Sequence, residues 1–169
     1  MQEKTSILSV RAAPTGPVGA IFSEGDGAMK VRDCMTDAAV SVGAGESAAY
    51  CARLMARYNV GCLPVLAAGR LQGIVTDRDL VVRCVAAERE ASRLPVGQIM
   101  TCRVSTVKPE DDVLRAVHLM QREQIRRLPV VKGGKLVGMI SLADLFAEED
   151  CTMEAADCLC EISKNIKRI

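Results

Sequence analysis

The fold of this chain is decided by the stretch GIVTDRDL at positions 73–80, because a close variant, GMISLADL, returns at positions 138–145. In both copies an apolar run is followed by a hydroxyl side chain and, three residues later, by a carboxylate. These residues are Thr76 with Asp79 and Ser141 with Asp144. The question is whether this duplicated pair binds a ligand or only stabilises the fold.

The duplication extends far beyond these eight residues. A shift of 65 positions carries Leu63-Pro64-Val65 onto 128–130 and Met35-Thr36 onto 100–101, with no gap. Such self-similarity is typical of a domain built from repeated units. The chain therefore contains two related halves.

Each half has the same predicted order of elements. Apolar residues at helical spacing predict helices near 48–55 and 113–120. Short strands are expected before them, in AAVSV and RVSTV, and after them, in CLPVL, RLQGIV, LPVV and KLVGMI. Closing helices are expected in DRDLVVRCVAAERE and LADLFAEEDC. The fold class is thus α+β, with two β-α-β-β-α repeats stacked through their sheets in pseudo-twofold symmetry.

Four segments follow from this division. We expect a flexible extension over 1–28, a first repeat over 29–90, a second repeat over 91–147, and a helical tail over 148–169. Pro64 and Pro129 cannot donate to a β-ladder, so their strands are expected to lie at an edge or to begin at the proline.

Composition excludes several classes of function. The 22 basic and 21 acidic residues are mixed along the chain, and only four residues are aromatic, which argues against nucleic acid as a partner. No apolar stretch is long enough for a membrane span, and the opening lacks the apolar core of a signal peptide. A cytoplasmic protein without membrane association is expected.

The eight cysteines are expected to be reduced, because several lie in apolar or helical segments and no export signal is present. Cys151, Cys158 and Cys160 have a spacing that matches no standard zinc framework, so no metal site is predicted. A thiol-based redox sensor is kept as a weaker hypothesis.

Two interpretations of the Thr/Ser-x-x-Asp pairs are open. Both pairs resemble a helix capping box with aspartate in place of glutamate. The same geometry also suits a ligand, since a helix N-terminus favours phosphate and a carboxylate can accept from two ribose hydroxyls. Gly73 and Gly138 would then allow a ligand to approach the strand backbone.

The repeated motifs resemble a known family. VRDCMT and VGQIMT, CLPVL and RRLPVV, and GIVTDRDL and GMISLADL look like a tandem pair of cystathionine β-synthase (CBS) domains, also called a Bateman module. The resemblance covers about Met29 to Phe146. It implies two clefts between the repeats for adenosine-containing ligands such as AMP, ADP, ATP or S-adenosylmethionine.

The resemblance also implies roles for individual residues. Asp79 and Asp144 match ribose-binding aspartates, and Thr76 and Ser141 match hydroxyls on the phosphate side. The other matches are residues lining the adenine (Ala39, Val40, Val104 and Ser105) and residues of the apolar wall (Leu63, Pro64, Leu128 and Pro129).

The two halves differ in their arginines. Arg126 and Arg127 precede the second LPVV, whereas Arg78 lies only in the first half. Arginine binds phosphate through paired donors, so these three residues are candidate phosphate contacts and the two sites are expected to differ in affinity. The alternative for Arg126 and Arg127 is a solvated strand end or an interface pair, and the alternative for Arg78 is exposure to solvent on its helix.

No catalytic constellation is visible. The one histidine, His118, has no nucleophile partner at motif spacing, and no P-loop or G-x-S-x-G motif is present. The expected function is that of a non-enzymatic, homodimeric sensor that signals to an effector protein. A scaffolding dimer with empty clefts is the alternative.

Overall fold

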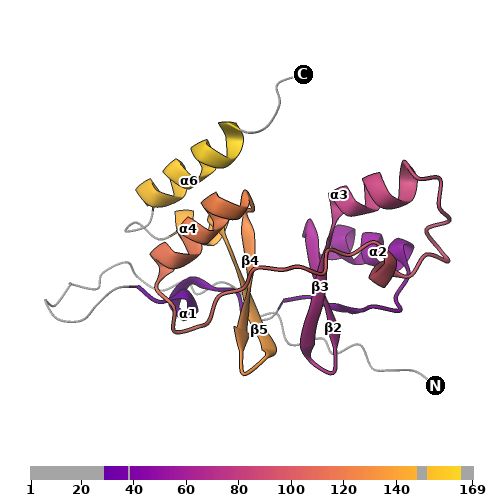
Figure 1. Cartoon of the computed structure of the whole chain (residues 1–169), viewed down its shortest axis with the longest axis horizontal. Helices are drawn as coiled ribbons and strands as arrows, with labels where there is room; N and C mark the ends of the chain where they lie inside the picture. Colours follow the sequence, from indigo (N-terminus) through magenta and orange to yellow (C-terminus); the bar gives the residue numbers. More distant parts are fainter. Residues whose placement is uncertain (1–28, 38, 148–151, 165–169) are drawn as a thin grey trace, which may run out of the picture. The chain divides into compact units, whose positions relative to one another are not determined.

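The computed structural model describes residues 29–37, 39–147 and 152–164 (Figure 1). The predicted extension at 1–28 lies outside these residues. The fold class is mixed α+β, as predicted, with helices and strands in both repeats. Contacts divide the chain into two compact units.

The first unit contains Ala39–Ser105 together with Val131–Val137, and the other described residues belong to the second. Residues 29–37 therefore cluster with the second repeat, and residues 91–105 cluster with the first. The segment boundaries given above remain predictions.

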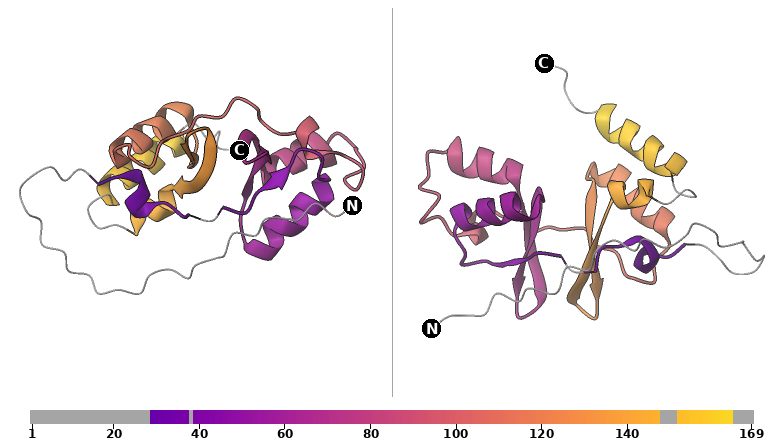
Figure 2. Two further views of the ribbon diagram at one scale, coloured as in Figure 1. Left: turned by 90° about the horizontal axis from the view of Figure 1, so that it is seen from below. Right: turned by 180° about the vertical axis from the view of Figure 1, so that it is seen from behind.

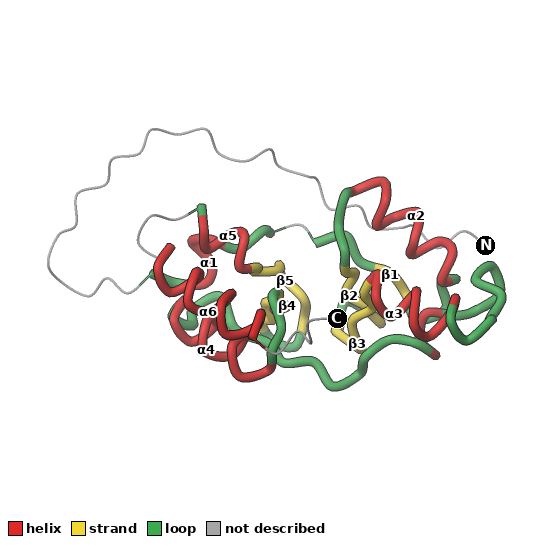
Figure 3. Tube along the Cα trace, turned by 90° about the horizontal axis from the view of Figure 1, so that it is seen from above, coloured by secondary structure: helices red, strands yellow, loops and turns green. Residues whose placement is uncertain are grey.

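The first repeat follows the predicted order of elements. It contains β1 (Val42–Gly43), α2 (Ala48–Tyr58), β2 (Cys62–Ala67), β3 (Arg70–Thr76) and α3 (Asp77–Leu80). A π-helical turn, η1 (Val81–Val85), continues α3, and a short 3-10 helix, η2 (Val96–Gln98), follows. Helices α2 and α3 lie on the same side of β2 and β3 in Figure 1, and Figure 3 shows β1 with these strands.

The strands of the first repeat pair as a small mixed sheet. β1 runs parallel to β2, and β2 runs antiparallel to β3. Pro64 lies opposite Ile74, whose backbone N–H and C=O are both bonded to Thr101 instead. Because Ile74 needs no partner from β2 at this point, the missing N–H of Pro64 leaves no group unsatisfied.

Helix α2 begins and ends where its sequence allows. The Ser47 side chain accepts a hydrogen bond from the Tyr50 amide at 3.2 Å, and Asn59 at the C-terminus adopts the left-handed conformation. Its buried face packs into a core with residues from all three strands; the members with no exposed surface are Cys51, Leu63, Val65, Val75 and Val96.

The second repeat contains α4 (Val113–Glu123), β4 (Arg127–Lys132), β5 (Lys135–Ser141) and α5 (Leu142–Phe146). The same unit contains α1 (Val31–Cys34), from the start of the described chain, and α6 (Thr152–Lys164), which follows the second repeat in sequence. Figure 2 shows α6, in yellow, beside α4, in agreement with the contacts of α6 with α4 and α5.

The predicted first strand of each repeat is largely wrong. Of the segment AAVSV only Val42 is in a strand, which it forms with Gly43. In the segment RVSTV the β-pairing is a single bridge between Val107 and Val130. The Lys108 amide donates to the Asp111 carboxylate at 2.8 Å, so the chain turns immediately after Val107. β-branched residues form a strand only where a neighbouring strand can pair with them.

The closing helices are also shorter than predicted. In place of a regular helix over 77–90, α3 ends at Leu80 and the π-helical turn occupies 81–85. Helix α5 ends at Phe146. None of the helices in the described ranges is long and apolar enough to cross a membrane.

Candidate functional site

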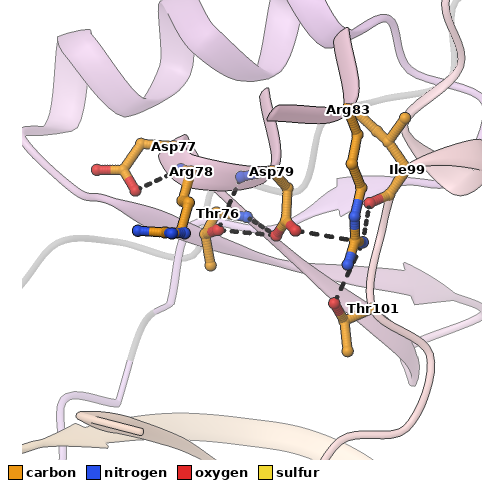
Figure 4. A network of polar contacts seen from close by, with 7 residues as sticks. All are labelled: Thr76, Asp77, Arg78, Asp79, Arg83, Ile99 and Thr101. Carbon is orange, nitrogen blue, oxygen red and sulfur yellow. Dashed lines mark hydrogen bonds and ion pairs between the residues drawn. The ribbon is translucent and has the colours of Figure 1, made fainter. Parts of the chain in front are cut away.

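Thr76 and Asp79 form the capping box that their spacing predicts, at the point where β3 passes into α3 (Figure 4). Asp79 Oδ2 accepts from the Thr76 amide at 2.9 Å and from the Thr76 hydroxyl at 2.7 Å. The Asp79 amide in turn donates to Thr76 Oγ1 at 3.1 Å. The Asp79 side chain is only 13% exposed, so this carboxylate is held in one orientation.

Ser141 and Asp144 repeat this geometry between β5 and α5. Asp144 Oδ2 accepts from the Ser141 amide at 2.7 Å and from the Ser141 hydroxyl at 2.6 Å, and the Asp144 amide donates back at 3.3 Å. The capping interpretation is therefore realised in both repeats. It leaves the second carboxylate oxygen, Oδ1, outside the capping box in each case.

The first repeat has one contact that the second lacks among the residues described. Arg83, in the π-helical turn, places Nη1 3.2 Å from Asp79 Oδ1. The same nitrogen donates to the Ile99 carbonyl at 2.6 Å and lies 3.3 Å from the Thr101 hydroxyl (Figure 4). Arg83 thus joins the candidate ribose-binding carboxylate to the chain segment that leads into the second repeat.

Sequence reasoning missed Arg83. The available signal was its position four residues after Asp79, a spacing at which opposite charges on a helix meet. The contacts with Ile99 and Thr101 have no such signal, because they join residues 16 and 18 positions apart.

The close approach predicted at Gly73 and Gly138 is made by the protein itself. A Cβ at Gly73 would lie 2.8 Å from the Thr101 carbonyl, and one at Gly138 would lie 2.7 Å from the Thr36 carbonyl. Backbone hydrogen bonds in both directions join Ile74 with Thr101 and Met139 with Thr36. The expectation that a ligand takes this space is corrected: the MT dipeptides at 35–36 and 100–101 occupy it.

The backbone before β4 also reaches the start of a closing helix. The Arg126 carbonyl accepts from the Leu142 amide at 3.1 Å, as the Gly61 carbonyl accepts from the Asp77 amide in the first repeat. The side chains of Arg78, Arg126 and Arg127 are exposed. Arg126 therefore adds an exposed arginine beside the Ser141–Asp144 pair, where the first repeat has glycine.

The other predicted site residues differ in burial. Leu63, Pro64, Leu128 and Pro129 are buried within the described residues, and Leu63 belongs to the core of the first unit. The four candidate adenine-lining residues, Ala39, Val40, Val104 and Ser105, are half-buried. A role of these eight residues in ligand binding stays a prediction.

The described part of the chain holds no group of three or more metal-ligating side chains. Cys158 is buried on α6, its thiol lies 3.7 Å from the Val117 carbonyl, and burial raises its pKa. Cys160 is exposed, and Cys151 lies outside the described residues. The buried thiol at 158 is therefore poorly suited to the redox hypothesis.

The pKa of the Cys51 thiol is raised from 9.0 to about 11, chiefly by burial. We expect iodoacetamide near pH 8 to alkylate the exposed Cys102 and Cys160 and to spare Cys51, since the thiolate is the nucleophile. Peptide mass spectrometry measures this difference. Equal alkylation of Cys51 and Cys102 in the native protein would contradict the expected difference in thiol reactivity.

The same pKa shift makes stability depend on pH. Because the pKa of Cys51 is higher in the folded than in the unfolded protein, its contribution to the free energy of unfolding is retained below pH 9.0 and is lost as pH rises toward about 11.

The duplicated capping boxes, with strand-turn-helix units repeated in the same order, define a protein built from two related repeats. The family model of the CBS domain matches residues 31–85 and 96–149, and the chain belongs to this family. The resemblance inferred from the motifs is confirmed.

Among individual relatives, the chain is 35% identical over 133 residues to the CBS domain-containing protein YhcV of Bacillus subtilis, covering 79% of this chain and 94% of YhcV. It is also similar to the crystal structure of Hypoxic Response Protein I with two coordinated zinc ions, at 28% identity and a TM-score of 0.65, covering 70% and 98% of the two chains. Hypoxic response protein 1 of Mycobacterium tuberculosis is 30% identical over 115 residues, covering 68% of this chain and 80% of the relative. The matches cover most of the length of each of these relatives.

Proposed function

We propose that this chain is a cytoplasmic, non-enzymatic regulatory module that binds an adenosine-containing ligand, such as AMP, ADP, ATP or S-adenosylmethionine, and signals its occupancy to a partner protein. The proposal is carried by one observation: in each capping box, one oxygen of the aspartate carboxylate takes no part in the capping hydrogen bonds. In both repeats one oxygen of the aspartate is fixed by two hydrogen bonds, and Oδ1 is outside them.

A carboxylate held in this way suits a ribose. The two adjacent hydroxyls of a ribose are donors, and an ionised carboxylate has about four lone-pair positions, of which the capping box uses two. Because the side chain is already ordered, little rotamer entropy is lost when the ligand binds. The exposed Arg126 and Arg127, with Arg78 in the first repeat, supply donors for an anionic part of the ligand.

Membership of the CBS family supports the proposed ligand class. A solved structure with the same fold, the CBS domain pair of protein MJ0100, is in complex with 5-methylthioadenosine and S-adenosylmethionine. It is 23% identical to this chain with a TM-score of 0.65, and it covers 72% of this chain and 95% of its own. This fold can therefore hold adenosine ligands.

For signalling, the bound ligand has to favour one conformation of the protein over another. A ligand that binds two conformations with equal affinity does not change the equilibrium between them. We propose a homodimer as the signalling unit and an effector protein as its target. Exposed apolar side chains on η1 and α6 are available for such contacts: Val81, Val82, Val85, Met153 and Leu159.

Replacing Asp144 by alanine tests the proposal. We expect AMP or S-adenosylmethionine to bind the second site about 5- to 150-fold more weakly, because a charge-assisted hydrogen bond worth about 1–3 kcal/mol is lost. Isothermal titration calorimetry measures the change. The matched control is Asp112→Ala, which removes the carboxylate that caps α4 by accepting from the Leu114 amide at 2.8 Å.

Both substitutions remove a carboxylate that accepts a backbone hydrogen bond at a helix N-terminus, so both are expected to lower stability by roughly 0.5–2 kcal/mol. Only Asp144→Ala should also weaken the ligand. Equal ligand affinity in the two variants would remove Asp144 from the site. Absence of binding by wild-type protein to all four ligands would refute the proposed function.

The capping hydrogen bonds favour one alternative, a scaffolding module with empty clefts. There the pairs at Thr76 and Ser141 serve only to begin helices α3 and α5. This alternative predicts a loss of stability in Asp144→Ala and no rise in the melting temperature of the wild type with any adenosine ligand.

A further inference from the structure

We propose that Arg83 competes with the ligand for Asp79, so that the first site opens only when the Arg83–Asp79 ion pair breaks, and that this release frees the segment Ile99–Thr101. The inference rests on the proposed function, because it concerns regulation of the same site. It assigns Arg83 a positioning role that the sequence motifs do not contain.

The competition follows from the use of the two oxygens of Asp79. Oδ2 is occupied by the amide and hydroxyl of Thr76, and Oδ1 lies 3.2 Å from the Arg83 guanidinium. A ligand that donates two hydroxyls to Asp79 has to approach the oxygen that Arg83 already contacts. The ligand therefore has to displace Arg83 from Asp79 when it binds.

The second repeat serves as an internal comparison. Asp144 has the same two bonds on Oδ2 and forms no ion pair with any described residue. The shift of 65 positions places Glu148 where the first repeat has Arg83, so the sequence reverses the charge there. The second site is thus expected to bind first.

The local backbone directs Arg83 toward this contact. A π-helical turn over Val81–Val85 follows the four-residue α3, and the Ala86 amide bonds to the Val81 carbonyl at 2.8 Å. Such turns insert an extra residue into a helix and occur frequently at functional sites. In Figure 4 the Arg83 side chain extends between Asp79 and the backbone at Ile99.

The other contacts of Arg83 provide the coupling. Nη1 donates to the Ile99 carbonyl at 2.6 Å, and Thr101 two residues later is paired with Ile74 of β3. Arg83 therefore stabilises the docking of this segment on β3 from the side of the helix. When Asp79 is taken by a ligand, Arg83 loses the partner that orients it, and the segment leading to the second repeat is held by fewer bonds.

The test isolates the first site. Calorimetry measures AMP binding in Asp144→Ala protein, with and without the further substitution Arg83→Gln. The measurement is repeated in Asp144→Asn protein, because asparagine can still cap the helix. We expect Arg83→Gln to strengthen AMP binding about fivefold, near the upper range for a partly exposed ion pair. The control Arg93→Gln removes an arginine whose ion-pair partner is the exposed Glu90, and it should leave the affinity unchanged.

Hydrogen exchange supplies a readout that a merely structural role would not produce. In the Asp144→Ala protein, AMP should accelerate exchange of the Thr101 amide, and in the double variant this exchange should be fast with or without AMP. Unchanged or weaker AMP binding on Arg83→Gln would overturn the competition while the ligand-binding function stands. If AMP binds neither the wild type nor any variant, the proposed function fails and this inference fails with it.

Discussion

Replacing Leu63 by alanine is expected to lower the free energy of unfolding by about 2–5 kcal/mol, the largest effect of any change considered for this chain. Leu63 is 0% exposed and lies in β2 within the core of the first unit. Alanine would remove apolar contacts with the surrounding core and leave a cavity that the close-packed neighbours only partly fill. Urea denaturation monitored by circular dichroism measures the loss.

The matched control is Leu114→Ala on α4, where the leucine is 44% exposed. A change within about 0.5 kcal/mol is expected there, as is usual for surface positions. The two interpretations of Leu63 also separate in this experiment. If Leu63 is only a core residue, Leu63→Ala lowers the free energy of unfolding equally with and without AMP. If Leu63 also contacts the ligand, the loss in free energy of unfolding is larger when AMP is present. Similar losses for Leu63→Ala and Leu114→Ala would contradict the core assignment.

Replacing Gly73 by alanine is expected to destabilise the protein by about 1–3 kcal/mol, because the added methyl group overpacks a filled space. Its Cβ would lie 2.7 Å from Met100 Sδ and 2.8 Å from the Thr101 carbonyl. The Met100 side chain can move away, but the carbonyl accepts from the Ile74 amide at 2.9 Å and cannot retreat without breaking that bond. The segment around Thr101 should therefore separate from β3.

Gly45→Ala is the matched control for this prediction, since a Cβ at Gly45 would meet no atom within 4 Å. Thermal denaturation should show a lower midpoint for Gly73→Ala and little change for Gly45→Ala, at roughly 2–4 °C for each kcal/mol in a chain of this size. Hydrogen exchange should be faster at Ile74 and Thr101 in Gly73→Ala. A wild-type melting temperature in that variant would show that the close approach at Gly73 does not matter for stability.

The two repeats differ in two ways. One lies in the arginines, with Arg83 on Asp79 in the first repeat and exposed Arg126 and Arg127 in the second. The other lies in the first strand, which has two residues in the first repeat and is a single bridge in the second. Both occur within one duplicated pattern, so each repeat is a natural control for the other.

By itself the sequence determined the features of this protein that depend on neighbouring residues. The duplication, the helices at 48–58 and 113–123, the two hairpins and the capping boxes were predictable because their signals span a few positions. The hairpin turns follow the same rule: Ala68 and Gly69, and then Gly133 and Gly134, adopt positive φ values, as two-residue turns between antiparallel strands require.

Only the tertiary structure decided which segments share a unit and which side chains meet. The MT dipeptides dock beside Gly73 and Gly138, the expected first strands shrink for lack of partners, and the predicted closing helix changes to a π-helical turn after Leu80. The contact of Arg83 with Ile99 joins residues 16 positions apart. Local propensity cannot specify such contacts, because their free energy depends on groups brought together only after the chain has folded.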